Sequence, residues 1–153
     1  MGSKSKPSPP IAPLEERTFL VLLKLADGLS QECEQLIKAA GLTAAQYNVL
    51  RILRGARPQG LACTSISERM ISHDPDMTRL LDRLEKRGLI TRERQKDDRR
   101  VVRTHITEQG MHLLKPVDQP MRELHKKQFQ HLSAKRLKGL FELLQQAHNC
   151  KTD

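Results

Sequence analysis

The sequence predicts a mainly α-helical fold with a small β wing. Residues 64–88 contain two helical patterns separated by a turn with a proline. Two short runs rich in β-branched residues follow, over 90–95 and 101–106, and the charged segment QKDDRR joins them. Long apolar patterns with helical spacing flank this region, over 14–40 and 107–149. The combination is typical of an α+β winged helix-turn-helix domain with additional N- and C-terminal helices.

The second helix of this region has clear end signals and two different sides. We expect Asp74 to cap its free N–H groups, Pro75 to be its first helical residue and Asp76 to face the positive end of its dipole. Gly88 is expected to end it in a left-handed conformation. One side is apolar and predicted to be buried: Met77, Leu80, Leu81 and Leu84. The opposite side is charged, as a major-groove reader requires, and carries the predicted DNA contacts Arg79, Asp82, Arg83 and Lys86.

The first helix of the motif is expected over 64–71, with Thr64 as its cap. Three apolar side chains are expected to face inward: Ile66, Met70 and Ile71. Three polar ones are left free to bind phosphates: Ser65, Ser67 and Arg69. The preceding residues 61–63 are predicted to form a small extra strand, and Thr43 is expected to cap a helix that runs to about residue 56.

The charged segment between the two β-rich runs is predicted to be the long tip of a hairpin. Its cations can bind phosphates or enter a narrow minor groove: Lys96, Arg99 and Arg100. Asp97 and Asp98 are expected to support the wing by holding an arginine in place. From Arg79 to Arg103 the chain has ten basic and five acidic residues, so this stretch supplies +5 of the net charge of +9.

Composition favours a double-stranded anionic partner. The net charge of +9 over 153 residues favours nucleic acid. The chain has no Trp, one Tyr and three Phe, whereas proteins that bind RNA or single strands usually stack bases on aromatic side chains. Duplex DNA, bound through its grooves and phosphates, is therefore the predicted partner.

Two segments resemble the MarR family of winged-helix regulators. The segment TRLLDRLEKRGLITRERQKDDRRVVRTHITEQG is similar to the recognition helix and wing of that family. The segment LTAAQYNVLRIL resembles the helix that precedes them. The resemblance covers residues 42–110 and extends to the flanking helices only in outline.

The resemblance implies a function and a second site. It implies a sequence-specific transcriptional regulator that binds a pseudo-palindromic double-stranded operator as a homodimer, most simply a repressor released by a small phenolic or aromatic acid effector. The effector would lie between the DNA-binding lobe and the dimerisation helices. Four polar residues are candidates for that pocket: Arg17, Tyr47, Arg51 and His73.

The flanking segments predict dimerisation helices. Residues 18–29 are apolar on nearly every side, which a small domain cannot bury alone, so a partner chain is expected. We divide the chain into an N-terminal arm without regular structure (1–13), a dimerisation helix (14–40), a winged-helix DNA-binding domain (42–106) and C-terminal dimerisation helices (107–149). Thr107 and Ser133 are expected to cap the last two helices, and Pro116 and Pro120 to kink or break the first of them. An apolar stripe follows Ser133: Leu137, Leu140, Phe141 and Leu144.

Other functions are weighed against this one. Cys63 precedes a predicted helix N-terminus, which leaves redox control through a cysteine as an alternative. A winged helix that binds only protein is another, but the charged outer side of residues 79–86 argues against it. The scattered histidines and the lack of a nucleophile or phosphate-loop motif predict no enzyme, and we expect no cofactor, no metal and no membrane partner. A cytoplasmic location is the expectation.

Overall fold

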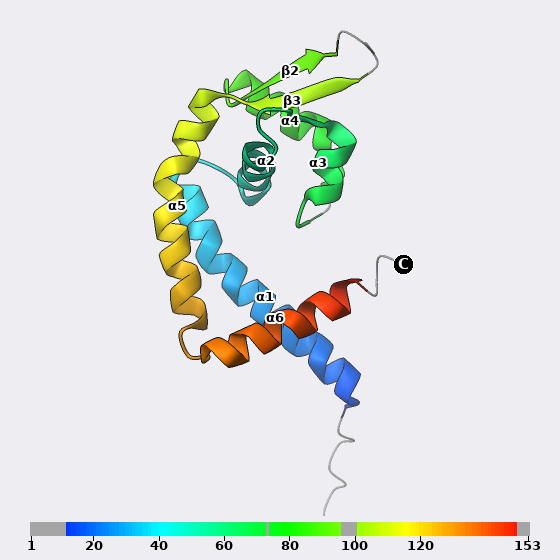
Figure 1. Cartoon of the computed structure of the whole chain (residues 1–153), viewed down its shortest axis with the longest axis vertical. Helices are drawn as coiled ribbons and strands as arrows, with labels where there is room; N and C mark the ends of the chain where they lie inside the picture. Colours follow the sequence, from blue (N-terminus) through cyan, green and yellow to red (C-terminus); the bar gives the residue numbers. More distant parts are fainter. Residues whose placement is uncertain (1–11, 73, 96–100, 150–153) are drawn as a thin grey trace, which may run out of the picture.

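The computed structural model describes residues 12–72, 74–95 and 101–149. Its elements, in chain order, are α1 (Leu14–Ala39), α2 (Ala44–Gly55), β1 (Leu61–Ala62), α3 (Cys63–Arg69), α4 (Met77–Lys86), β2 (Ile90–Arg94), β3 (Val102–Ile106), α5 (Glu108–Phe129) and α6 (Ala134–Asn149). Elements α2 to β3 form one lobe, here called the winged-helix lobe, and α5 connects it to α6, which overlaps α1 in this view at the other end of the molecule (Figure 1). The predicted fold class is confirmed.

Apolar residues from all parts of the winged-helix lobe form its core. The most deeply buried side chains come from four helices and one strand: Val49, Leu50, Leu53, Ile66, Leu81, Leu84, Ile90 and Leu114. Leu114 belongs to α5, so this helix is packed into the same core as the lobe. The apolar stripe predicted for α4 is buried along its whole length.

The sheet has three antiparallel strands in the order β1-β3-β2. In the hairpin Ile90 lies opposite Ile106, and Arg94 lies opposite Val102. The backbone N–H of Gln95 donates to the carbonyl of Val101 at 3.0 Å, which extends the pairing toward the tip. The predicted wing and its small extra strand are therefore both present.

The connection between α1 and α2 follows its local signals. Gly41 has φ of 72° and ends the first helix, in a conformation that a side chain would oppose. Thr43 and Gln46 form a reciprocal capping box in which each side chain binds the backbone N–H of the other. The expected cap at Thr43 is confirmed.

Two predictions about α3 are wrong. The helix begins at Cys63 after Ala62, so Thr64 lies within its first turn and makes no capping bond. Ile66 is buried as expected, but the helix ends at Arg69 and Ile71 is 84% exposed. The chain becomes extended at Met70, which turns the next side chain away from the core.

The expected break in α5 does not occur. Thr107 caps the helix by accepting a bond from the N–H of Gly110 at 3.1 Å, and the helix continues through Pro116 and Pro120. Both prolines are exposed and four residues apart, so they lie on one solvent-facing side. The carbonyl groups that lose their partners can therefore bind water there instead of being buried.

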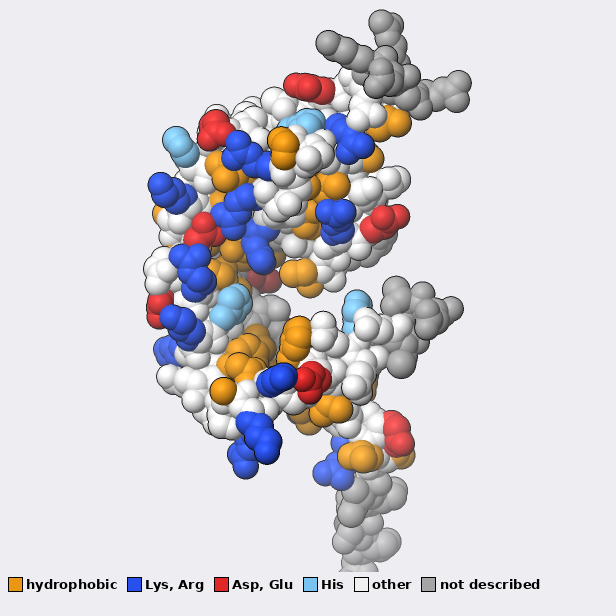
Figure 2. Space-filling model, in the orientation of Figure 1, with side chains coloured by type: hydrophobic (Ala, Val, Ile, Leu, Met, Phe, Trp, Pro, Cys, Tyr) orange, Lys and Arg blue, Asp and Glu red, His pale blue; other side chains and the backbone are white. Residues whose placement is uncertain are grey.

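Large apolar side chains remain exposed on α1 and α6. In α1, Phe19 is 59% exposed and Val21 63%, and in α6, Phe141 is 58% exposed. The predicted stripe on α6 includes Leu137 and Leu144, which are 36% and 40% exposed. Figure 2 shows apolar side chains gathered around these helices. None of the helices described here is long and apolar enough to cross a bilayer.

The junction between α4 and β2 is fixed by a left-handed glycine. Gly88 has φ of 70°, its N–H donates to Glu85, and the N–H of Leu89 donates to Leu84 at 3.0 Å. This pair of bonds is the Schellman arrangement, which satisfies the last carbonyl groups of α4. Thr107 Oγ1 donates to the carbonyl of Gly88 at 2.7 Å, so the start of α5 holds the same turn.

Replacing Gly88 tests this junction. Gly88→Ala should lower the free energy of unfolding by about 1–2 kcal/mol, because an L side chain opposes a left-handed backbone, and its Cβ would lie 2.9 Å from Gln109 Oε1. Gly55→Ala is the matched control, since Gly55 is helical with open space around it; it should be neutral or stabilising by up to about 1 kcal/mol. Urea unfolding at one fixed protein concentration measures both, and equal stability of the two variants contradicts the assignment.

Candidate nucleic-acid interface

Helix α4 begins two residues later than its sequence signals predict. Asp76, not Asp74, is the cap, and its Oδ1 accepts a bond from the N–H of Arg79 at 3.3 Å. Asp74 Oδ1 instead accepts from the N–H of Asp76 at 2.8 Å, which forms a turn before the helix. Pro75 therefore lies in this turn and is not the first helical residue.

Three of the predicted DNA contacts on α4 are exposed cations. The Arg79 side chain is 81% exposed and its Nε lies 3.2 Å from Asp76 Oδ2. Arg83 is exposed and its Nε donates to the carbonyl of Arg79 at 3.2 Å, and Lys86 is exposed near the end of the helix. These side chains are opposite the buried stripe of α4, where a DNA groove can reach them.

The fourth predicted contact, Asp82, is engaged within the protein. Arg92 of β2 donates from Nη2 to Asp82 Oδ1 at 2.6 Å and from Nε to Glu85 Oε2 at 2.9 Å. The sequence alone predicted no role for Glu85 or Arg92. The i, i+3 spacing of Asp82 and Glu85 shows that the two acids are neighbours on the helix. It does not show that their partner is Arg92, which lies on the following strand.

Two other cations of this region, Arg87 and Arg103, have structural partners. Arg87 Nη1 donates to the carbonyl of Gly41 at 3.1 Å and to Gln46 Oε1, so it ties the end of α4 to the start of α2. Arg103 Nη1 donates to the carbonyl of Gly60 at 3.2 Å. Both therefore also help to hold the lobe together.

Helix α3 and the wing supply the other predicted contacts. Ser65 and Ser67 are half-buried and Arg69 is exposed at the end of α3. The predicted contacts at the hairpin tip and their supporting acids lie outside the described residues: Lys96, Asp97, Asp98, Arg99 and Arg100.

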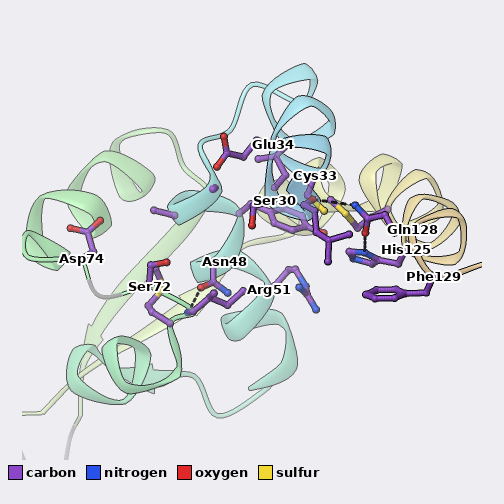
Figure 3. Close-up of a pocket in the computed structure, with 18 of the residues that line it drawn as sticks. Ser30, Cys33, Glu34, Asn48, Arg51, Ser72, Asp74, His125, Gln128 and Phe129 are labelled. Atoms are coloured by element: carbon purple, nitrogen blue, oxygen red, sulfur yellow. Dashed lines mark hydrogen bonds between the residues drawn. The ribbon is translucent and has the colours of Figure 1, made fainter. Parts of the chain in front are cut away.

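A cavity of about 630 Å³ lies between the winged-helix lobe and the helices α1 and α5. Figure 3 shows that α1 contributes Ser30, Cys33 and Glu34 to it, while His125, Gln128 and Phe129 come from α5. The remaining wall is formed by α2 and by the segment between α3 and α4. This volume is within the range of small-molecule sites.

Two of the four predicted effector residues line the cavity. The guanidinium of Arg51 lies over the ring of Tyr47, 5.7 Å from its centre, and both face the cavity. Burial raises the pKa of Tyr47, while the charge of Arg51 opposes the shift. Arg17 is misplaced in the prediction: it is exposed and about 18 Å along α1 from Leu29, the nearest lining residue of that helix. His73 lies outside the described residues.

Polar bonds tie the cavity walls to one another. Asn48 Oδ1 of α2 accepts from the N–H of Ile71 at 2.9 Å, which holds the segment leading to α4 (Figure 3). Gln128 Nε2 of α5 donates to the carbonyl of Leu29 in α1 at 3.1 Å, and its Oε1 lies 3.1 Å from Nδ1 of His125.

An ion pair joins the winged-helix lobe to α5. Arg54 of α2 binds Asp118 of α5 with both terminal nitrogens, at 2.8 and 2.9 Å. The two side chains are 28% and 25% exposed. This forked geometry fixes orientation as well as distance.

The cysteines differ in their surroundings. Cys33 is half-buried in the cavity wall; burial raises its pKa, the amide of Gln128 lowers it, and Glu32 and Glu34 raise it further. A raised pKa makes the reactive thiolate scarcer, which disfavours Cys33 as a sensor thiol. Cys63, the predicted redox candidate, is exposed at the start of α3. Over residues 12–72, 74–95 and 101–149, no three metal-ligating side chains come together.

Comparison with known proteins identifies the family. Residues 42–102 match the model of the MarR family. The crystal structure of a MarR transcription factor from Planctomyces limnophilus is 38% identical, covers 89% of this chain and 98% of its own, and superimposes with a TM-score of 0.66. The chain belongs to the MarR family. These matches confirm the resemblance of its recognition helix and wing to that family.

Curated relatives of this MarR-family protein are named as regulators. The HTH-type transcriptional repressor IacR of Pseudomonas putida is 26% identical over 139 residues, which are 90% of this chain and 82% of the relative. The HTH-type transcriptional regulator YpoP of Bacillus subtilis is 34% identical over 103 residues, 67% of this chain and 71% of the relative. The protein is a transcriptional regulator of the MarR family, and these relatives agree with the prediction that it is not an enzyme.

A structure of the S. aureus MepR–DNA complex shares the fold of this regulator. It is 20% identical, with a TM-score of 0.77, and the match covers 86% of this chain and 96% of that chain. At this identity the match concerns the fold alone, and it agrees with the winged-helix arrangement described above.

Proposed function

We propose that this regulator is a homodimeric, sequence-specific repressor that binds duplex DNA and is released by a small aromatic acid. The observation that carries DNA binding is the two-sided character of α4. Its apolar side is buried against the lobe, while Arg79, Arg83 and Lys86 are exposed on the other side. A capped helix anchored in this way can enter a major groove, where an arginine binds guanine through two bonds. The DNA complex of MepR, which shares the fold, supports this role.

The other predicted contacts position the protein on the phosphates. Ser65, Ser67 and Arg69 of the α3 region lie beside α4 and are suited to bind phosphate oxygens without reading sequence. At the hairpin tip we assign phosphate or minor-groove contacts to Lys96, Arg99 and Arg100, and a supporting role to Asp97 and Asp98.

Exposed apolar surface supports the homodimer. The N-terminal half of α1 and helix α6 leave six side chains more than half exposed: Leu14, Phe19, Val21, Leu23, Phe141 and Leu143. A monomer rarely exposes so much apolar surface in one region. A second copy that covers it would present two α4 helices to a pseudo-palindrome with half-sites about one helical turn, ~10 base pairs, apart.

The cavity supports control by a small aromatic acid. Its walls are largely apolar, and Arg51 provides a fixed positive charge beside the Tyr47 ring. An aromatic carboxylate fits this combination, since the ring packs on apolar surface and the carboxylate binds the guanidinium. The segment that includes Ile71 and Asp74 is both a wall of the cavity and the lead into α4. A ligand that moves this wall changes the position of the recognition helix, and the repressor IacR supports the direction of regulation.

Arg83 is expected to carry sequence specificity. Arg83→Ala should weaken binding to the specific duplex by about 1–3 kcal/mol and affect non-specific DNA less, because a base-edge contact is lost. Gel shifts with duplexes from the protein's own promoter region, against a scrambled duplex, measure this. The matched control is Arg122→Ala, an exposed arginine of α5 whose partner Gln119 is one turn away. Equal losses in the two variants would assign only general charge to Arg83.

A charge placed on the exposed part of α1 should separate the dimer. Phe19→Glu should weaken self-association by at least about 100-fold, because a carboxylate would be buried in an apolar interface. Light scattering after size exclusion measures the mass. Ile71→Glu is the control, since Ile71 is apolar and 84% exposed but belongs to the winged-helix lobe. A monomeric wild type, or a Phe19→Glu dimer as stable as wild type, removes the proposed interface.

Arg51 is expected to select carboxylates. Arg51→Met should lower the affinity for benzoate about tenfold, because a charge-assisted bond is lost, while phenol binding stays within about twofold of wild type. Isothermal titration with both probes measures this, and Arg17→Met is the control because Arg17 lies outside the cavity lining. Unchanged benzoate binding would show that the cavity does not use Arg51 for an acid.

A further inference from the structure

One arginine of the wing binds two carboxylates of the recognition helix. Arg92 Nη2 lies 2.6 Å from Asp82 Oδ1, and Arg92 Nε lies 2.9 Å from Glu85 Oε2. Asp82 and Glu85 are three residues apart in α4 and so point to neighbouring positions on the helix surface. The three side chains form a cluster, here called the Arg92 cluster.

The acids of this cluster lie on the side of α4 that DNA would approach. Asp82 is three residues after Arg79 and four before Lys86, so it shares their side of the helix, and Glu85 lies next to it. The Asp82 and Glu85 side chains remain 43% and 37% exposed. Without a partner, both negative charges would face the phosphates and repel them. They would also weaken the attraction of the exposed cations beside them for DNA.

The strand holds Arg92 in place for this contact. Arg92 lies opposite Thr104 in the hairpin, and Thr104 is buried at 1% exposure. Directly opposite residues share one side of a sheet, so the Arg92 side chain leaves the strand on its covered side and is only 27% exposed. Bonding to Arg92 lowers the pKa of Glu85, and bonding to Glu85 raises the pKa of Arg92, so both groups remain charged.

We propose that Arg92 is a positioning residue for DNA binding, which offsets one of the two negative charges of Asp82 and Glu85 and holds both carboxylates away from the DNA-facing side of α4. The inference rests on the proposed DNA-binding function and deepens it. We place the role of Arg92 in its bonds to the two acids, because Nε and Nη2 bind carboxylate oxygens and the side chain is only 27% exposed. Its loss therefore exposes two negative charges in addition to removing one positive charge.

The experiment compares four variants with wild type by fluorescence anisotropy with a promoter duplex over a salt series. Arg92→Met should bind at least about tenfold more weakly than wild type at low salt, where charge repulsion is least screened. Adding Asp82→Asn and Glu85→Gln to Arg92→Met should restore affinity to within about threefold of wild type, because no carboxylate is left to neutralise. The matched control is Arg94→Met, an exposed arginine on the same strand that is expected to lose less than the Arg92 variant.

Each outcome decides for or against the role of Arg92. Wild-type affinity for Arg92→Met overturns it. A triple variant that stays as weak as Arg92→Met, with a salt slope reduced by about 1, overturns it in favour of a direct phosphate contact. The double variant Asp82→Asn/Glu85→Gln keeps Arg92 and should bind at least as tightly as wild type, so a tenfold loss there also overturns it, even if Arg92→Met does not fold. If the wild-type protein does not bind the duplex, the proposed DNA-binding function itself is rejected. If the wild type binds and Arg92→Met binds equally well, only this inference is rejected.

Discussion

Burial of one side of α4 against the lobe is the constraint on which the rest of the structure depends. Leu80, Leu81 and Leu84 are almost completely buried in the same core as Ile66 of α3 and Leu50 of α2. Apolar burial holds the helix in place but has little directional preference. The cap at Asp76 and the left-handed turn at Gly88 add directional bonds at the two ends. Together they determine which side chains of α4 face outward, and these include the cations Arg79, Arg83 and Lys86.

The order of elements and most helix ends could be predicted because their signals are local. Gly41, Thr43, Thr107 and Gly88 act through bonds to residues within a few positions, so the sequence alone shows their partners. The start of α4 could not be placed in this way, because Asp74 and Asp76 are both good acceptors and only the three-dimensional turn decides between them. The predicted break at the prolines of α5 was wrong for a related reason, since the effect of a proline depends on which side of the helix faces solvent.

The exposed positive charge of the candidate site could be predicted from the sequence, but the ion pairs between its residues could not. The exposed cations of α4 follow from helical spacing, which places them opposite the apolar stripe. The pairing of Arg92 with Asp82 and Glu85 depends on how β2 packs beside α4, and no sequence spacing specifies that. The same holds for Arg54 and Asp118, which are 64 residues apart. Arg17 failed as a cavity residue because α1 is straight enough to carry it far from the lobe (Figure 1).

The fork between Arg54 and Asp118 has a mechanical consequence. It joins the winged-helix lobe to α5 through charged groups that water can still reach, beside the apolar core in which Leu114 and Val117 of α5 pack against the lobe. Solvent can replace the bonds of the fork at low cost, so the shared core, more than the ion pair, holds α5 on the lobe. We therefore expect the lobe and the first half of α5 to move as one rigid body. In the proposed dimer, the distance between the two recognition helices would then be set outside this body, by the rest of α5 and by α1.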